Sequence, residues 1–595
     1  MRSHGGLHLG KLKSSKVMSR LISTIKKTAE DSKHINPSHT MIEKLRSKPE
    51  HIIPLIEKMS NETLDTHCYC LAITILSRLP DHKQATLLIN NLINSNIADT
   101  EAIFQGLLLA RDRLNVMSWA VFDLLILAYC RLKRPQDALA SFYLSTHNNI
   151  LPNTQTCNAM LSLFLRFNNT RLPWLLYTHM FRLGIKSTLV TFNIMINVLC
   201  KQGKLNKAMD FILHMEALSF NPTVVTYSTL LNGYCCKGDI DGAYRILALM
   251  KGKGLDPDTY TYGSLINGLC KKRRLVEASK LLREMLDSGF TPSAVHYNSL
   301  IDGYCNMGEL TTAFSFKDEM IIKGIMPTVS TYNTLIQSMF LEARYQDVKN
   351  LTKEMEVKGI QRDVITYNIL IHGYSRADNA RLAFKLHDEM LRKGIEPTRI
   401  TYTSLIYILG KKHKMEKADA LFSEVMGKGI SPDLVMFNSL IDGHCASGNI
   451  VKALSLLEQM ERMNILPDEI TYNTLIQGYC REGKVEDAYL LLNEMKDKGI
   501  RPDHISYGTL LCWYSKRGNM KEAFDVRDEM LRLGFELNLL TYNALIYGLC
   551  KIGEGAHAEK LLKEMVERGI TPDDSTYISL IKAVGHPEAI FAETE

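Results

Sequence analysis

The chain has 595 residues, 46% of them hydrophobic and 23% charged, which exceeds one ordinary domain and excludes a disordered chain. Its formal net charge of +7 permits a polyanionic partner without requiring one. The apolar runs, such as residues 122–130, are too short to span a bilayer, so no membrane insertion is expected.

The N-terminus is basic. The first 29 residues contain seven Lys or Arg, five Ser and no acid, and Glu30 is the first carboxylate. This composition is typical of an organelle transit peptide, although a plain basic, disordered N-terminus would have the same composition. We assign residues 1–60 to a transit peptide and disordered N-terminus, with the mitochondrion as destination and the plastid as alternative. Residues 61–118 are helical in pattern but match the following repeat poorly, so we predict a degenerate N-terminal cap.

A 35-residue repeat fills residues 119–573. Val224-Val-Thr-Tyr-Ser-Thr-Leu-Leu recurs, for example, as Glu469-Ile-Thr-Tyr-Asn-Thr-Leu-Ile. Thirteen consecutive repeats begin at residues 119, 154, 189, 224, 259, 294, 329, 364, 399, 434, 469, 504 and 539. A partial fourteenth repeat and a C-terminal tail occupy residues 574–595.

Each repeat has the pattern of two helices. Apolar residues recur at helical spacing in both halves, a short turn often contains Gly, and Ala holds one place of the second helix in eleven repeats. Gly or Asn then fits a left-handed C-cap, and Pro three residues later blocks continuation. We therefore predict an all-α fold, a right-handed superhelical solenoid of 35-residue helix-turn-helix repeats with an extended concave surface.

Cysteine follows the same period. Cys200, Cys235, Cys270 and Cys305 are each 35 residues apart, and no Cys-x-x-Cys pair occurs. We interpret them as small apolar packing residues rather than disulfide or metal sites, and we expect no cofactor.

The fifth residue of each repeat lies inside the first helix, yet none is a good helix former. Asn, Ser, Thr and Gly each cost ~0.5–1 kcal/mol against Ala. An Asn amide offers the donors and the acceptor that reading a base edge requires. The alternative is that Asn bonds a neighbouring helix and fixes the stacking, which would favour one residue type throughout. In order, the fifth residues are Asp123, Asn158, Asn193, Ser228, Gly263, Asn298, Asn333, Asn368, Thr403, Asn438, Asn473, Gly508 and Asn543.

The last residue of each repeat is always an N-cap residue placed before a helix. Capping explains why all these residues belong to one chemical class. It does not explain why the residue type changes from repeat to repeat. Capping and the reading of a base are therefore equally good and compatible explanations. In order, these residues are Asn153, Thr188, Thr223, Asp258, Ser293, Thr328, Asp363, Thr398, Asp433, Asp468, Asp503, Asn538 and Asp573.

The thirteenth residue is basic in nine repeats. A cation at a helix C-terminus is also favoured by the helix dipole, but a ladder of cations at a fixed spacing suits a phosphate backbone. The nine are Arg131, Arg166, Lys201, Lys271, Arg376, Lys411, Arg481, Lys516 and Lys551.

The repeats resemble the P class of the pentatricopeptide repeat family. The motifs are the Val-Thr-Tyr-Asn-Thr-Leu-Ile opening, the Gly-Tyr-Cys-Lys-x-Gly turn, the Ala-x-x-Leu second helix and the Met-x-x-x-Gly-Ile-x-Pro-Asp end. The stretch Asn473-Thr-Leu-Ile-Gln-Gly-Tyr-Cys is similar to the restorer-of-fertility-like branch of plants. The resemblance implies sequence-specific binding of single-stranded RNA in organelles, one base per repeat, with the N-terminal repeats on the 5′ side.

The resemblance also implies a code in the fifth and last residues. Asn with Asp implies uridine, Thr or Ser with Asp implies guanine, Asn with Thr implies a pyrimidine, and Gly508 with Asn538 implies adenine. The second residue, for example Val225, Ile365 or Ile470, would pack against neighbouring bases. The first and fifth repeats have fifth and last residues that depart from the pairs familiar in the family, so no base is assigned to them.

Two other functions compete. A peptide-binding scaffold of the tetratricopeptide kind would have a period of about 34 and a Trp-Leu-Gly-Tyr signature. An RNA-editing deaminase would need His-x-Glu with Pro-Cys-x-x-Cys, whereas His387-Asp388-Glu389 supplies only the first half. We interpret that triplet as surface charge and expect neither catalysis nor a small-molecule substrate. The expected partners are RNA and other organelle RNA-processing proteins, in processing, stability, splicing or translation of a transcript.

Overall fold

The computed structural model describes residues 42–44, 49–58, 65–95 and 97–584, and every regular element in these ranges is a helix. The chain divides into two compact units, Met1–Pro292 and Ser293–Glu595, which are described separately. Of the predicted transit peptide and N-terminus, residues 1–60, the structure describes only residues 42–44 and 49–58. No helix in the described part combines the length and apolar character needed to cross a bilayer.

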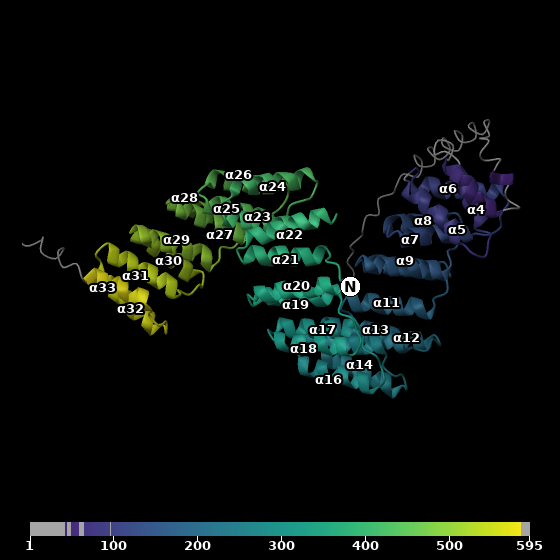
Figure 1. The fold of residues 1–595 in the computed structure, drawn as a ribbon, viewed down its shortest axis with the longest axis horizontal. Coiled ribbons are helices and arrows are strands. Elements are labelled where there is room, and N and C mark those ends of the chain that lie inside the picture. The colour runs from purple at the N-terminus through teal and green to yellow at the C-terminus, as the bar shows by residue number, and fades with distance from the viewer. Residues whose placement is uncertain (1–41, 45–48, 59–64, 96, 585–595) are drawn as a thin grey trace, which may run out of the picture. The chain divides into compact units, whose positions relative to one another are not determined.

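The N-terminal unit is a row of helices joined by short turns (Figure 1). It contains η3 (Pro49–His51), α3 (Ile52–Lys58), α4 (Thr66–Leu76), α5 (Lys83–Asn94), α6 (Thr100–Arg113), α7 (Ala120–Arg131), α8 (Pro135–His147), α9 (Thr154–Arg166), α10 (Arg171–Arg182), α11 (Leu189–Lys201), α12 (Leu205–Ala217), α13 (Val224–Lys237), α14 (Ile240–Gly252), α15 (Thr259–Lys271) and α16 (Leu275–Asp287).

The C-terminal unit continues with the same two-helix repeat. It contains α17 (Ala294–Asn306), α18 (Leu310–Ile322), α19 (Val329–Leu341), α20 (Tyr345–Val357), α21 (Val364–Arg376), α22 (Ala380–Arg392), α23 (Arg399–Lys411), α24 (Met415–Gly427), α25 (Leu434–Ala446), α26 (Ile450–Arg462), α27 (Glu469–Arg481), α28 (Val485–Asp497), α29 (His504–Arg517), α30 (Met520–Arg532), α31 (Leu539–Lys551), α32 (Gly555–Glu567) and α33 (Asp574–Val584). The predicted all-α solenoid of helix-turn-helix repeats is confirmed.

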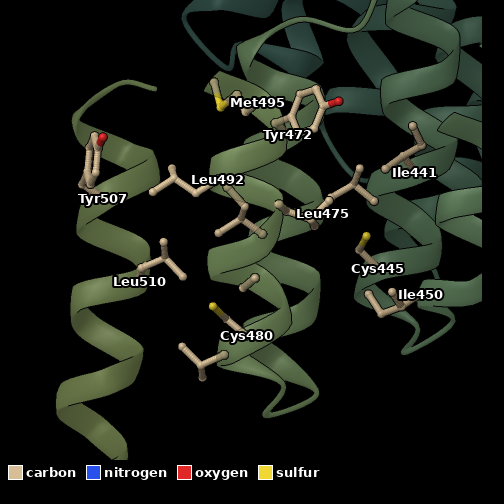
Figure 2. Close-up of a cluster of buried hydrophobic side chains, with 14 of the residues drawn as sticks. Ile441, Cys445, Ile450, Tyr472, Leu475, Cys480, Leu492, Met495, Tyr507 and Leu510 are labelled. Atoms are coloured by element: carbon tan, nitrogen blue, oxygen red, sulfur yellow. The ribbon is translucent and has the colours of Figure 1, made fainter. Parts of the chain in front are cut away.

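Within each unit, first helices pack against first helices and each also packs against its own second helix. Helix α27, for example, contacts α25, α28 and α29. Figure 2 shows the apolar side chains that fill these contacts, among them Tyr472, Leu475 and Leu492, all fully buried. The alanine that recurs in the second helix is fully buried in all eleven repeats that carry it, as predicted for close helix approach.

The periodic cysteines are packing residues, as predicted. A Cβ built on Gly233 would lie 2.5 Å from Sγ of Cys200, so the glycine of one repeat makes room for the cysteine of the repeat before. Burial raises the pKa of the Cys200 thiol to about 12, which keeps it protonated at neutral pH. Two helices reach backbone contact where glycine faces glycine: a Cβ on Gly410 would lie 3.3 Å from the Cα of Gly443.

Helical packing continues into the predicted N-terminal cap. Helix α4 packs against α5 and α6, and α5 packs against α7. The described part of residues 1–60 also includes helix α3, whose Ile52 is fully buried in the hydrophobic core. Helical structure in the N-terminal unit therefore begins before the boundary that we predicted at residue 60.

The turns impose the same backbone conformation whatever residue occupies them. All thirteen repeats have a positive φ at the end of the second helix and another between the two helices. Glycine supplies most of these positions, but Ala343 adopts φ 56 between α19 and α20. A non-glycine residue pays roughly 1–2 kcal/mol to adopt this left-handed conformation.

We predict that Ala343→Gly stabilises the protein by about 0.5–1 kcal/mol, because the release of strain exceeds the added entropy of the unfolded chain. Ala377→Gly is the matched control: Ala377 ends α21 with φ −76, where alanine is unstrained. This second change should lower stability. Denaturant midpoints measured by circular dichroism will compare them, and a shift of both variants in the same direction would refute the strain argument.

Candidate RNA-binding surface

The last residue of each repeat caps the first helix of the next repeat. Asp468 has an extended backbone, and its Oδ1 accepts a hydrogen bond of 2.9 Å from the backbone N–H of Thr471. The Thr471 hydroxyl also donates to Asp468 Oδ1 at 2.8 Å. The capping role inferred from residue type alone is therefore correct.

The fifth residue reaches the same junction from the preceding repeat. Asn438 Nδ2 donates to Asp468 Oδ1 at 3.2 Å, and Asn438 Oδ1 accepts from the Thr471 hydroxyl at 2.7 Å. Asn, cap and Thr thus form a closed cluster across two repeats. All eight asparagines at the fifth place accept from the third residue of the next repeat: Asn158, Asn193, Asn298, Asn333, Asn368, Asn438, Asn473 and Asn543.

Seven of these asparagines also donate to the last residue of their own repeat. The paired caps are Thr188, Thr328, Asp363, Thr398, Asp468, Asp503 and Asp573. The two places that we singled out separately are thus physically joined. Asparagine does fix the stacking, which was the alternative explanation. An amide has two N–H groups and two lone pairs, so one of each remains uncommitted.

The pKa of the carboxylate lies below its ordinary value at three caps, Asp363, Asp503 and Asp573. Burial alone would raise the pKa of Asp503, but hydrogen bonds from the backbone of Ser506, the Asn473 amide and the Ser506 hydroxyl outweigh it. The resulting pKa lies below its ordinary value. Since an ionised carboxylate only accepts hydrogen bonds, the cap fixes which end of the Asn473 amide points toward it.

The third residue was missed in the sequence analysis. It is buried and polar in every repeat from the second to the thirteenth except the tenth, where Met436 replaces it. The signal was present in the recurring Val-Thr-Tyr opening, but a β-branched residue in the first turn of a helix is unremarkable by itself. Its importance depends on the hydroxyl meeting the preceding repeat, which only the packing shows.

Fifth residues other than Asn are satisfied differently. The Ser228 hydroxyl lies 2.6 Å from that of Thr261, and the Thr403 hydroxyl donates back to the Arg399 carbonyl at 2.9 Å. Asp123, in the first repeat, accepts from the backbone N–H of Asn153 at 3.0 Å. Burial raises the pKa of Asp123. Gly263, in the fifth repeat, has no side chain to satisfy.

An exposed apolar side chain stands at the second place of ten repeats, beside the fifth residue. This is unusual, because most other large apolar side chains in these first helices are buried. Tyr260, for example, is 56% exposed and Ile470 57%. The ten are Val190, Val225, Tyr260, Val295, Ile365, Ile400, Val435, Ile470, Ile505 and Leu540.

The basic residues at the thirteenth place are all exposed. None of the nine forms an ion pair with another residue in the described ranges. Two of them act on helix ends: Lys201 Nζ donates to the Leu165 carbonyl at 2.9 Å, and Lys551 Nζ donates to the Lys516 carbonyl at 2.7 Å. The helix-dipole explanation therefore holds in part, and a positive surface remains.

These places meet in one groove of about 500 Å³ over α29 and α31. Its lining includes the second residue Ile505, the fifth residues Gly508 and Asn543, the last residue Asn538 and the thirteenth residue Lys516. The structure therefore brings all four kinds of predicted site residue to a single surface in these repeats.

One interpretation from the sequence was wrong. The His387-Asp388-Glu389 triplet is not simply surface charge: His387 is 8% exposed and packs edge-on against Tyr402, with ring centroids 6.1 Å apart. Glu389 Oε1 accepts from the Tyr367 hydroxyl at 2.8 Å and pairs with Arg362 at 3.0 Å. Only Asp388 is well exposed. Among the described residues, no cluster of His, Cys, Asp or Glu is arranged to hold a metal ion.

Stacked two-helix repeats, each with a capped first helix and a variable fifth residue, define a tandem α-helical repeat protein. The sequence model of the PPR repeat family matches residues 152–201, 187–236, 222–271, 292–340, 327–376, 362–411, 432–478, 467–512, 503–551 and 538–586, and a single-repeat model matches residues 260–290 and 400–430. The chain belongs to the pentatricopeptide repeat family.

Relatives in the family are plant proteins. A mitochondrial pentatricopeptide repeat-containing protein of Arabidopsis thaliana is 47% identical over 132 residues, which cover 22% of this chain and 21% of the relative. Another Arabidopsis thaliana member is 31% identical over 142 residues, which cover 23% of this chain and 19% of the relative. The chain thus aligns with about a fifth of each relative's own length.

A solved structure shares the fold. The crystal structure of the pentatricopeptide repeat protein PPR10 in complex with an 18-nucleotide psaJ RNA element has a TM-score of 0.58 and 22% identity. The alignment covers 93% of this chain and 89% of that chain.

We predict that Thr471→Val destabilises the C-terminal unit by about 1–3 kcal/mol, because Asn438 and Asp468 lose a buried donor. Thr474→Val is the control in the same helix: the Thr474 hydroxyl is exposed and donates only to the Ile470 carbonyl. Its effect should stay within about 0.5 kcal/mol. Denaturant midpoints and amide exchange at the start of α27 will measure both, and equal effects would show that the junction is not special.

Proposed function

We propose that this protein binds single-stranded RNA in a sequence-specific manner, one base per repeat, and acts in organelle RNA metabolism without catalysing a reaction itself. The observation that carries the proposal is the joined pair of fifth and last residues, which varies between repeats inside a constant frame. A purely structural junction has no need of that variation.

The neighbouring side chains support a nucleic acid ligand. An uncommitted amide N–H and lone pair at each Asn suit a base edge. The exposed apolar second residues suit the faces of unpaired bases, and the unpaired cations at the thirteenth place suit phosphates. The solved PPR10 complex contains RNA, and its fold is shared along nearly the whole chain.

The family resemblance gives the proposed target. Read from the 5′ end, the thirteen repeats select any base, pyrimidine, pyrimidine, G, any base, pyrimidine, U, pyrimidine, G, U, U, A and U. We further propose a mitochondrial location, supported by the basic, acid-free first 29 residues and by the mitochondrial relative. Other RNA-processing proteins of the organelle are the proposed protein partners.

We predict that the protein binds a 13-nucleotide RNA of this sequence far more tightly than the same RNA annealed to its complement, because paired bases cannot enter a one-base-per-repeat surface. Affinity should fall with salt by roughly 0.7 log units per log unit of salt for each phosphate contacted. Filter binding across a salt series will test both. Equal affinity for single strand and duplex would overturn the proposed function and favour a peptide-binding scaffold.

We predict that Thr403→Asn moves the preferred ninth base from G to U. Asp433 remains in place as the cap of α25, accepting from the Met436 backbone N–H at 3.0 Å, so the fold should be preserved. A changed base-edge contact is worth ~1–3 kcal/mol of discrimination by analogy with DNA readout, or roughly tenfold and more. Competition between two oligonucleotides that differ only at the ninth base will measure the preference.

The structure sharpens this experiment. Met436 lacks the hydroxyl that orients the asparagine in neighbouring repeats, so an Asn at 403 would be held only by Asp433. Adding Met436→Thr to Thr403→Asn should strengthen the U preference, whereas Met436→Thr alone reports the cost of the lost core volume. An unchanged G preference in both asparagine variants would show that the fifth residue is structural.

A further inference from the structure

The groove over α29 and α31 has depth because its fifth residue is glycine. A Cβ added at Gly508 would meet only Cγ2 of Thr541, at 3.7 Å, so open space replaces the side chain that asparagine provides elsewhere. The groove of about 500 Å³ continues along both helices from the N-caps toward Lys516.

The junction beside Gly508 is also rearranged. With no asparagine to meet, the Thr541 hydroxyl turns to its own cap and donates to the Asn538 carbonyl at 2.8 Å. Asn538 Oδ1 accepts from the Thr541 backbone N–H at 3.0 Å. The Asn538 Nδ2 group has no hydrogen-bond partner among the described residues, and Asn538 is one of the residues that line the groove. It is therefore a free donor for a ligand.

Two aromatic side chains line the groove farther along the helices. Tyr547, at the ninth place of the thirteenth repeat, is 45% exposed. Trp513, at the tenth place of the twelfth repeat, stands where the adjacent repeats have Gly478 and Gly548. Lys516 Nζ lies 5.1 Å from the centroid of the Trp513 ring. Aromatic side chains beside an open space and a cation suit a large flat ring attached to a phosphate.

We propose that this groove is a purine subsite, in which the space left by Gly508 admits the larger base and Tyr547 supplies a stacking face. The proposal rests on the proposed RNA-binding function and adds a specificity-determining residue outside the fifth and last places. Asn538 Nδ2 donates to a ring nitrogen or carbonyl of the base, and purines expose such acceptors on their edges.

The test uses the full chain and three forms of the 13-nucleotide RNA, with A, C or an abasic residue at the twelfth place. Tyr547→Ala should weaken binding of the A form by about tenfold, near the lower end of the loss of a base–aromatic stack. It should leave the abasic form unchanged, and Tyr547→Phe should retain the wild-type affinity. Tyr407→Ala is the matched control, since Tyr407 holds the ninth place of the ninth repeat.

A second variant tests the open space directly. Gly508→Leu places a good helix former over the groove, so the fold should hold while the preference for A over C is lost. Gly508→Ala, which fills little of the groove, should keep that preference. Trp513 gives an optical readout: in a Trp119→Phe, Trp174→Phe background it is the only tryptophan, and its emission should change with the A form and not with the abasic form.

The outcomes separate the two proposals. If the wild type binds RNA and Tyr547→Ala has no effect, or weakens all three forms equally, the purine subsite is wrong and the proposed function stands. If the wild type binds none of the three RNAs, the proposed function itself fails. A tenfold loss confined to the A form, abolished by Gly508→Leu, establishes the subsite.

Discussion

The structure depends on a buried hydroxyl at the third place of ten of the thirteen repeats. Thr471 is fully buried, and its one side-chain oxygen joins the cap of its own helix to the asparagine of the repeat before. That contact fixes where the helix starts, how far it lies from its neighbour and which way the amide faces. Since polar groups buried without partners are costly, the hydroxyl, cap and amide hold one another in a single arrangement.

This junction explains how a fold with a constant period tolerates a variable fifth residue. Where asparagine is absent, the next hydroxyl finds another acceptor: Thr261 bonds Asp258 at 2.6 Å, and Thr541 bonds the Asn538 carbonyl. No buried hydroxyl is left unsatisfied at these two junctions when the fifth residue changes. The frame is therefore stable to substitutions that alter the chemistry presented to a ligand.

Much of this organisation could be predicted from residue spacing. The helices, their caps and the packing role of Cys200 all follow from a period, because a position that recurs in every repeat has the same neighbours each time. The pairing of a fifth residue with the third residue of the next repeat could not, since residue types do not reveal which surfaces meet. The prediction that His387 is exposed was wrong because it rested on the charged neighbours in sequence and not on the helical spacing. Ala383 and Met390 lie on the same face of α22 and are buried with His387.

The glycine pair at Gly410 and Gly443 has a mechanical consequence. In a solenoid each repeat touches only its neighbours, so small rotations add in series along the array. An interface with backbone in contact at its centre is a stiff joint in such a series, because fewer side chains there can change rotamer to absorb strain; Met415 is the flexible side chain beside Gly443. Bending of the C-terminal unit is then concentrated on either side of α23 and α25, and the two repeats that share this joint move together as one rigid body.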